Sequence, residues 1–197
     1  MFDFYFCSLT FLFCFLDDFL NDLLWTGVKG KNRPKRTYLI ASIKDNDGKD
    51  IFNERFKNTP FGKHAEKTML CDGDFRKAVA YHHNMEIVLT LNYSPCSSCA
   101  DDLKLFYETY RNIGNLTIQF SFLYNIQEEE NRSGLRNLTN AGVTLQAMNA
   151  NLWREVGIDL ESMASEDERR ISGRDKNTGD MLYAVLYRYQ NEQDQDT

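Results

Sequence analysis

The spacing of hydrophobic residues changes several times along the chain, and each spacing predicts a type of element. Apolar residues about four positions apart predict an amphipathic helix at Phe15–Trp25, and short apolar runs bounded by turn residues predict strands. An Asp-Gly pair within Asp45–Lys49 predicts the turn of a β-hairpin. We expect strands at Thr37–Ile43, Ile51–Phe56, Glu86–Leu91, Leu116–Tyr124 and Val143–Met148, and further helices at Lys63–His83, Pro95–Asn112 and Ser133–Ala141.

Two segments contain residues that disfavour a continuous helix. Gly73 lies within the helix expected at Lys63–His83 and predicts an interruption there. The last part of the chain, Asn151–Gln190, predicts two helices, because the polar stretch Ser172–Asp175 separates its apolar positions.

The alternation of strands and helices predicts an α/β fold, in which a sheet with parallel pairs carries helices on its faces. A helix between the last two strands permits them to run parallel, whereas a tight turn would force them antiparallel. We expect residues 15–197 to form one domain, with a core at about 37–150 and C-terminal helices at about 151–190. Residues 1–14 are an apolar extension of undecided role.

The charge of the chain disfavours long-range attraction to nucleic acid, since the net charge is −6 and the pI is about 5.1. Positive charge is nevertheless concentrated in one segment, the basic cluster, whereas acids collect elsewhere, as in Glu128–Glu130. The basic cluster consists of Lys29, Lys31, Arg33, Lys35 and Arg36. Such a cluster is either a solvated face or a set of phosphate contacts.

The number of cysteines and the N-terminal segment indicate in which cellular compartment the protein is expected. Five cysteines, an odd number, fit a reducing compartment better than a disulfide framework. The apolar run Phe4–Leu16 is too short to span a membrane as a helix and lacks the basic start of a signal peptide. We therefore expect a cytoplasmic or nuclear protein without membrane contact, as a monomer or a weak dimer. Glycosylation sequons at Asn115, Asn131 and Asn137 leave secretion as the alternative.

Two motifs carry the candidate chemistry. His64-Ala65-Glu66 is followed further along the chain by Pro95-Cys96-Ser97-Ser98-Cys99, a pattern that resembles the zinc-deaminase signature. Cys96 and Cys99 share one face at a helix start, where the helix dipole favours thiolates. With His64 they would leave the fourth tetrahedral position of Zn²⁺ for water. Glu66 can then act as a catalytic acid and base beside that water.

Each motif alone has other interpretations. A Cys-x-x-Cys is more often half of a structural zinc site or a redox pair, and a His-x-Glu by itself carries no information. A closed structural zinc site would need a fourth ligand, for which Cys71, His82 and His83 are the candidates. They lie up to several turns from His64 along the expected helix. The two motifs together therefore favour an open, catalytic site.

Further segments resemble the AID/APOBEC family of polynucleotide cytosine deaminases, from Phe15 to about Trp153. The matching residues are Thr37-Tyr38-Leu39, Gly62–Glu66, Tyr93–Cys96, Leu123-Tyr124, and Gly134–Leu138 running into Ala141–Val143. The resemblance implies a three-layer α/β/α cytidine-deaminase fold with a five-stranded mixed sheet, and a hydrolase acting on the C–N bond of cytosine. The expected substrate is single-stranded DNA. RNA, free cytidine or dCMP, and a catalytically silent binding protein are the alternatives.

The resemblance also implies a set of substrate contacts. We expect the basic cluster to contact the phosphate backbone of the nucleic acid. The residues implied are Asn58, Ala65, Tyr93, Ser94, Tyr124, Asn125 and Ile126. Tyr124 would pack against the target base, and Asn125 and Ile126 would meet the preceding nucleotide. Tyr93 stands where the family usually has Trp, and Asn92 where it usually has Ser, so we expect an altered pocket.

Overall fold

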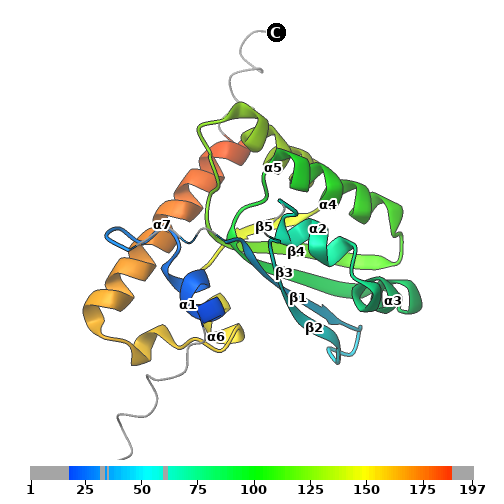
Figure 1. Ribbon diagram of the computed structural model, residues 1–197, viewed down its shortest axis with the longest axis horizontal. Coiled ribbons are helices and arrows are strands. Elements are labelled where there is room, and N and C mark those ends of the chain that lie inside the picture. Colours follow the sequence, from blue (N-terminus) through cyan, green and yellow to red (C-terminus); the bar gives the residue numbers. More distant parts are fainter. Residues whose placement is uncertain (1–17, 32–33, 35, 60–61, 188–197) are drawn as a thin grey trace, which may run out of the picture.

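The computed structural model describes residues 18–31, 34, 36–59 and 62–187. Within these residues, one mixed sheet of five strands carries seven α-helices and a short 3-10 helix at Leu160–Ser162 (Figure 1). The strands are β1 (Tyr38–Lys44), β2 (Asp50–Lys57), β3 (Met85–Tyr93), β4 (Ile113–Phe122) and β5 (Thr144–Ala147). Their order across the sheet is β2-β1-β3-β4-β5.

The directions of the strands place the loops after β3 and β4 at the same end of the sheet. β1 is antiparallel to both β2 and β3, whereas β3, β4 and β5 run parallel, which confirms the expected parallel orientation of the last two strands. The crossovers are α4 (Ser97–Thr109) and α5 (Glu129–Asn140). Because the carboxyl ends of β3 and β4 lie at the same edge, the loops that follow them are neighbours.

Helices cover both faces of the sheet, as the α/β/α expectation requires (Figure 1). The helices are α1 (Asp18–Trp25), α2 (Ala65–Leu70), α3 (Gly73–Tyr81), α6 (Ala150–Glu155) and α7 (Ser165–Tyr187), together with α4 and α5. On one face, α2 to α5 bury side chains such as Leu103 and Leu135 against the strands. On the other, α1, α6 and the first half of α7 enclose a second cluster around Trp153.

The face of the sheet toward α1 and α7 includes buried polar side chains from its central strands, β3 and β4. Thr90 donates to Gln119 at 3.1 Å, and Ser121 donates to the carbonyl of Leu23 at 2.8 Å. Gly27, just after α1, has a φ of +77°, and a Cβ there would lie 2.3 Å from the ring of Phe122. The end of α1 can therefore approach β4 closely only because residue 27 is glycine.

The expected break within the C-terminal helix is wrong. α7 runs without interruption from Ser165 to Tyr187, straight through Ser172–Asp175. The two charged side chains at the supposed break are buried: Arg174 and Asp175 are both 6% exposed. They bind partners far away in the sequence, and these contacts outweigh the local polarity that predicted a loop.

Other boundaries are shifted by a few residues. The interruption near Gly73 is confirmed: α2 ends at Leu70, and the Asp72 side chain caps α3 by accepting from the backbone N–H groups of Asp74 and Phe75. α4 begins at Ser97 rather than Pro95, and α5 begins at Glu129 rather than Ser133. Residues 1–17, including the apolar extension, lie outside the described residues.

Of the helices described, none couples sufficient length with sufficient hydropathy to cross a membrane.

Candidate metal centre and active site

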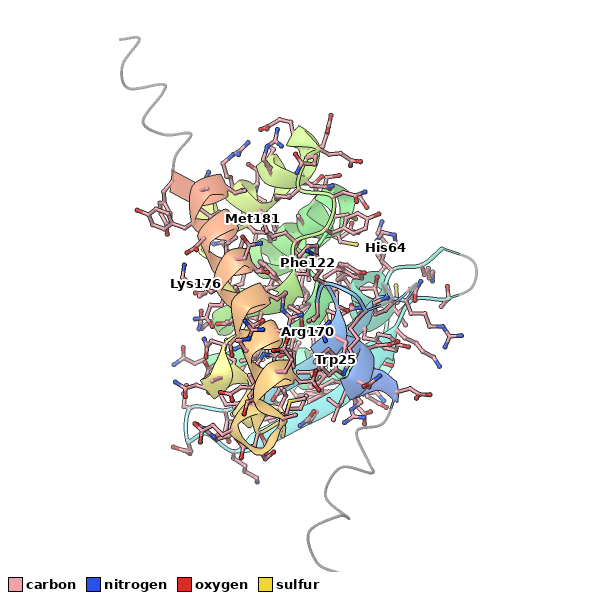
Figure 2. The ribbon with its side chains drawn as sticks, turned by 90° about the vertical axis from the view of Figure 1, so that its left-hand side faces the viewer. Trp25, His64, Phe122, Arg170, Lys176 and Met181 are labelled. Atoms are coloured by element: carbon pink, nitrogen blue, oxygen red, sulfur yellow. The ribbon has the colours of Figure 1, made fainter. Side chains whose placement is uncertain are left out.

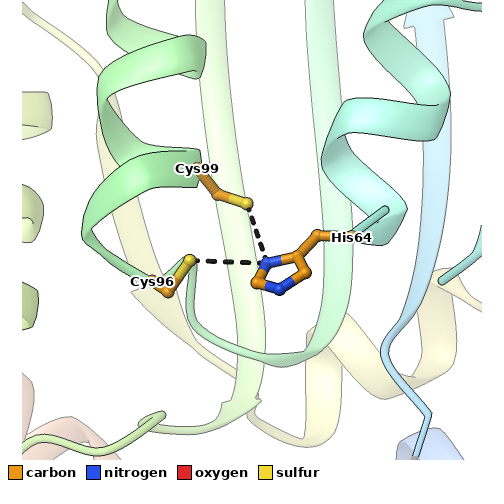
Figure 3. Close-up of side chains that lie close together, drawn as sticks. All are labelled: His64, Cys96 and Cys99. Carbon is orange, nitrogen blue, oxygen red and sulfur yellow. Dashed lines mark hydrogen bonds between the residues drawn. The ribbon is translucent and has the colours of Figure 1, made fainter. Parts of the chain in front are cut away.

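Three side chains that can bind a metal meet at the starts of two helices. His64 precedes α2 and Cys96 precedes α4, each in an extended conformation, and Cys99 lies in the first turn of α4. The Nδ1 atom of His64 faces both sulfurs, at 3.2 Å from Cys99 Sγ and 3.4 Å from Cys96 Sγ (Figure 3). The three candidate ligand atoms lie within 4.8 Å of one another. The imidazole at the start of α2 and the two thiols at the start of α4 thus converge on a single point.

The spacing of these atoms suits a tetrahedral metal ion. Zinc takes Cys sulfur at about 2.3 Å and His nitrogen at about 2.0–2.1 Å, which separates the two ligand atoms by about 3.6 Å at a tetrahedral angle. The distances from His64 to the two sulfurs are only slightly shorter. The three candidates for a fourth ligand, Cys71, His82 and His83, do not belong to this group of donors. The cluster can therefore hold a metal ion with one position open.

Glu66 supplies a carboxylate beside the cluster. Its side chain is 2% exposed, and its Oε2 atom has no hydrogen-bond partner among the described residues. Burial raises the pKa of Glu66 to about 7, and the sulfur of Cys96 adds to the rise. A buried carboxylate oxygen without a partner is uncommon in folded proteins. Such an oxygen is expected where a bound water molecule or a substrate supplies the missing hydrogen bond.

The two cysteines differ in acidity. A hydrogen bond from Cys99 lowers the pKa of the Cys96 thiol to about 4, and the same contact, together with burial, raises the pKa of Cys99. Cys96 is therefore the more acidic of the two thiols. A metal ion binds cysteine as the thiolate, so Cys99 must lose its proton on binding.

A cavity of about 840 Å³ opens onto these groups, within the size range of small-molecule sites. Its lining combines His64, Glu66 and Cys96 with residues of the segment before β1 and of the loops after β2, β3 and β4. Of the implied substrate contacts, it includes Asn58, Tyr93, Ser94, Tyr124, Asn125 and Ile126, and of the basic cluster it includes Arg36. Most of the residues singled out by the sequence are thus brought together around one opening.

Aromatic rings form one wall of this cavity. The rings of Tyr93 and Tyr124 meet edge to face, with centroids 6.1 Å apart and planes at 78°. The hydroxyl of Ser94 accepts from the backbone N–H of Tyr124 at 2.9 Å, and the Ser94 N–H donates to the carbonyl of Phe122 at 2.8 Å. Ser94 therefore fixes the loop after β4 against the end of β3.

Other predicted residues lie elsewhere. Ala65 is fully buried in the main core, and its side chain does not line the cavity. Lys29 and Lys31 are exposed but are likewise absent from the lining, and Lys31 Nζ instead lies 4.0 Å above the ring of Trp25. Arg33 and Lys35 lie outside the described residues.

Sequence reasoning missed the contribution of α7 to this cavity. Asn177 and Met181 complete its lining together with Phe122. Figure 2, in which α7 faces the viewer, shows Met181 on the C-terminal half of this helix. No motif marks these residues, because they approach the site only through the packing of α7 against β4 and β5.

Asn131 was also missed, since the sequence marks it only as part of a glycosylation sequon. It is 3% exposed, and its Oδ1 atom accepts from the N–H of Ser97 at 2.8 Å, at the start of α4. Its Nδ2 atom donates to the carbonyl of Asn125 and to the Glu128 carboxylate. Asn131 therefore links the helix that carries Cys96 and Cys99 to the loop after β4, and a glycan on it would break these bonds.

Comparison with known proteins agrees with this geometry. The family model described as Invertebrate-AID/APOBEC-deaminase matches residues 19–197. The "C->U-editing enzyme APOBEC-1" of Homo sapiens is 30% identical over 126 residues, which cover 61% of this chain and 51% of that protein. The "DNA dC->dU-editing enzyme APOBEC-3Ca" of Felis catus is 34% identical over 106 residues, 53% of each chain.

The chain spans about half the length of these curated relatives. The family model, in contrast, matches well over half of the chain. The converging group of His64, Cys96 and Cys99 consists of residues that the sequence motifs single out as candidate metal ligands. This chain belongs to the AID/APOBEC deaminase family.

Proposed function

We propose that this chain hydrolyses cytosine to uracil in single-stranded DNA, with a zinc ion as its cofactor. The observation that carries the proposal is the unpartnered, buried carboxylate oxygen of Glu66 beside three converging metal donors, in the lining of an open cavity. The relatives named as C->U and DNA dC->dU editing enzymes support cytosine as the base and DNA as a substrate.

The donor set favours zinc. Two thiolates and one imidazole are characteristic zinc ligands, and three protein ligands with an open fourth position are typical of catalytic rather than structural sites. Bound zinc would lower the pKa of a water molecule at the open position and so supply the nucleophile that attacks the amine-bearing carbon of cytosine. His64, Cys96 and Cys99 would hold the ion.

Glu66 moves the proton in this proposal. Its carboxylate takes one proton from the attacking water and delivers it to the ring nitrogen, then takes the second proton from the added hydroxyl group and delivers it to the departing amine, so that water and cytosine become uracil and ammonia. A group with this role must stay off the metal, and the three converging donors do not include Glu66. Its burial keeps bulk water from competing for the proton.

The cavity wall provides the binding surface for a base and its strand. Tyr93 and Tyr124 offer aromatic faces on which a base can stack, an interaction that tolerates any sequence. Arg36, at the rim, brings a positive charge for a phosphate. Asn125 and Ile126 also line the cavity, and the family resemblance implies that they would contact the nucleotide that precedes the target.

The acidic run beside this loop is less repulsive than the sequence suggests. Glu129 forms ion pairs with both Arg132 and Arg136. Glu128 accepts hydrogen bonds from Asn131 and Asn125. Part of the negative charge next to the cavity is therefore balanced within the loop and α5, which favours the approach of a strand.

The described cysteines, Cys71, Cys96 and Cys99, are free thiols. This state supports the cytoplasm or the nucleus, both reducing compartments, as the place of action.

The direct test incubates the chain with a DNA oligonucleotide that carries one cytosine, followed by uracil glycosylase and alkali. We expect strand scission at the former cytosine. Matched reactions contain the same sequence as RNA, the DNA as a duplex, and free dCMP. Conversion of dCMP without scission of the single strand contradicts the polynucleotide proposal, and conversion of the RNA alone moves the substrate to RNA.

A further inference from the structure

Asn92, a fully buried residue of β3, binds the end of the basic cluster from within the fold. Its Oδ1 atom accepts from the backbone N–H of Tyr38 at 2.9 Å. Its Nδ2 atom donates to the carbonyl of Arg36 at 2.9 Å and to the Thr26 hydroxyl at 3.4 Å. The amide therefore clamps the backbone on both sides of Thr37, at the point where the chain enters β1.

Two residues of the cavity lining hold the same segment. The hydroxyl of Tyr93 donates to the carbonyl of Pro34 at 3.4 Å. Asn58 exchanges two hydrogen bonds with Thr37: its Oδ1 atom accepts from the Thr37 N–H at 3.2 Å, and its own N–H donates to the Thr37 carbonyl at 3.1 Å. Polar groups of β3 and of the loop after β2 thus fix the backbone of this segment next to the cavity.

Arg36 is the charged residue that this arrangement presents. Arg36 is exposed and belongs to the lining of the cavity, its carbonyl is bound to Asn92, and its guanidinium lies beside the Tyr38 hydroxyl. A long side chain loses much conformational entropy when it binds a ligand, and it loses less when its backbone is already fixed. Holding the backbone of Arg36 therefore increases the fraction of time that its guanidinium spends at the rim.

We propose that Asn92 is a positioning residue for substrate binding: by clamping the backbone of Arg36 and Tyr38, it sets the Arg36 guanidinium at the cavity rim, where it contacts a phosphate of the single-stranded substrate. This inference rests on the proposed function. Asn92 itself touches no substrate, because it is fully buried and does not line the cavity.

The competing explanation is that Asn92 only stabilises the fold, as its neighbour Thr90 does. Thr90 is 3% exposed, lies two residues earlier on β3, and therefore projects from the same face of the sheet. Its hydroxyl donates to Gln119 and makes no contact with the segment before β1. Thr90→Val removes one buried hydrogen bond from this face, and it is the matched control.

The experiment compares Asn92→Ala, Thr90→Val, Arg36→Gln and the double variant Asn92→Ala/Arg36→Gln. KM and kcat are measured on the single-cytosine DNA oligonucleotide over a range of salt concentrations, and thermal unfolding shows which variants are folded. We expect Asn92→Ala and Arg36→Gln each to raise KM by roughly two- to tenfold, with kcat within about twofold of the wild type. We expect each also to lower the slope of log KM against log salt by about one.

The double variant separates positioning from stability. If Asn92 acts through Arg36, Asn92→Ala adds nothing to KM once Arg36 is replaced. A further rise in KM in the double variant, or an equal rise in Thr90→Val, overturns the inference. Should Asn92→Ala not fold, Tyr93→Phe keeps the ring and removes only the hydroxyl bound to Pro34. The same non-additivity with Arg36→Gln is then expected, and additive effects overturn it.

Binding and deamination by the wild-type protein distinguish a failure of the proposed function from a failure of the inference about Asn92. If it neither binds nor deaminates the oligonucleotide, the proposed function fails and this inference fails with it. If it does both and Asn92→Ala behaves like Thr90→Val, only the inference fails.

Discussion

In the proposed mechanism, replacing Glu66 is expected to separate metal binding from chemistry. We predict that Glu66→Gln, which keeps the shape but cannot carry the proton, retains about one zinc ion per chain and lowers kcat by at least a hundredfold, the usual scale of acid–base catalysis. Metal analysis and the oligonucleotide assay on the same preparation check both parts. Retained turnover would remove Glu66 from the mechanism, and loss of zinc would make it a ligand.

The proposed catalytic and metal-binding residues can be singled out from the sequence, whereas the residues that support them cannot. His64, Glu66, Cys96 and Cys99 belong to two short motifs whose spacing reflects metal chemistry, so local sequence is enough to find them. Asn131 has no such mark. Its bond to the start of α4 depends on α5 beginning at Glu129, four residues before the expected start.

At the scale of elements, α7 shows how tertiary contacts override a local pattern. Its stretch Ser172–Asp175 predicts a break, yet Arg174 donates to the carbonyls of Leu24 and Thr26 and forms an ion pair of 2.7 Å with Asp175. Asp175 also accepts from the indole N–H of Trp153 at 2.8 Å. Leu24, Thr26 and Trp153 are distant in sequence from this stretch, and no periodicity along residues 165–187 could reveal these contacts.

We predict that Arg174→Met lowers the free energy of unfolding by about 3–5 kcal/mol, because it leaves Asp175 buried without its cation and two carbonyls without their donor. Chemical denaturation measures this loss. Lys176 lies two positions after Arg174 on the same helix and forms an exposed ion pair with Asp180, so Lys176→Met is the control and leaves the unfolding free energy nearly unchanged. Equal small effects would show that the buried network is not what holds α7 to α1.

The same helix gives a prediction about specificity. Asn177 lines the cavity, so its amide can bond the edge of a base next to the target. We predict that Asn177→Leu changes the relative kcat/KM for oligonucleotides that differ in the base before cytosine by about two- to tenfold. Its exposed neighbour Lys176, outside this lining, is replaced by Leu as the control. An unchanged preference in Asn177→Leu would show that Asn177 of α7 does not contribute to the choice of the base before cytosine.

At the scale of the whole molecule, the fold class was predictable, and the distribution of charge was only partly so. The alternation of strands and helices gave the mixed sheet, since β3, β4 and β5 need helical crossovers to run parallel. The sequence could not show that only Arg36 of the described basic residues reaches the cavity rim, because that depends on how the segment before β1 is held.

The salt dependence of binding tests whether the rest of the basic cluster contacts the strand. We predict that the double variant Lys29→Gln/Lys31→Gln weakens binding of single-stranded DNA and lowers the slope of log Kd against log salt by up to about two. Lys44→Gln/Lys49→Gln, an equal charge change at the exposed β1–β2 hairpin, is the control and leaves the slope unchanged. Equal slopes for both variants would show that Lys29 and Lys31 form a solvated face.

The most direct test of the central claim is zinc X-ray absorption on the purified, zinc-loaded chain. We predict one zinc ion per chain with two sulfur ligands at about 2.3 Å and two nitrogen or oxygen ligands at about 2.0–2.1 Å, from Cys96, Cys99, His64 and a water molecule. A first shell with three or more sulfurs, or a chain that binds no zinc, would contradict it.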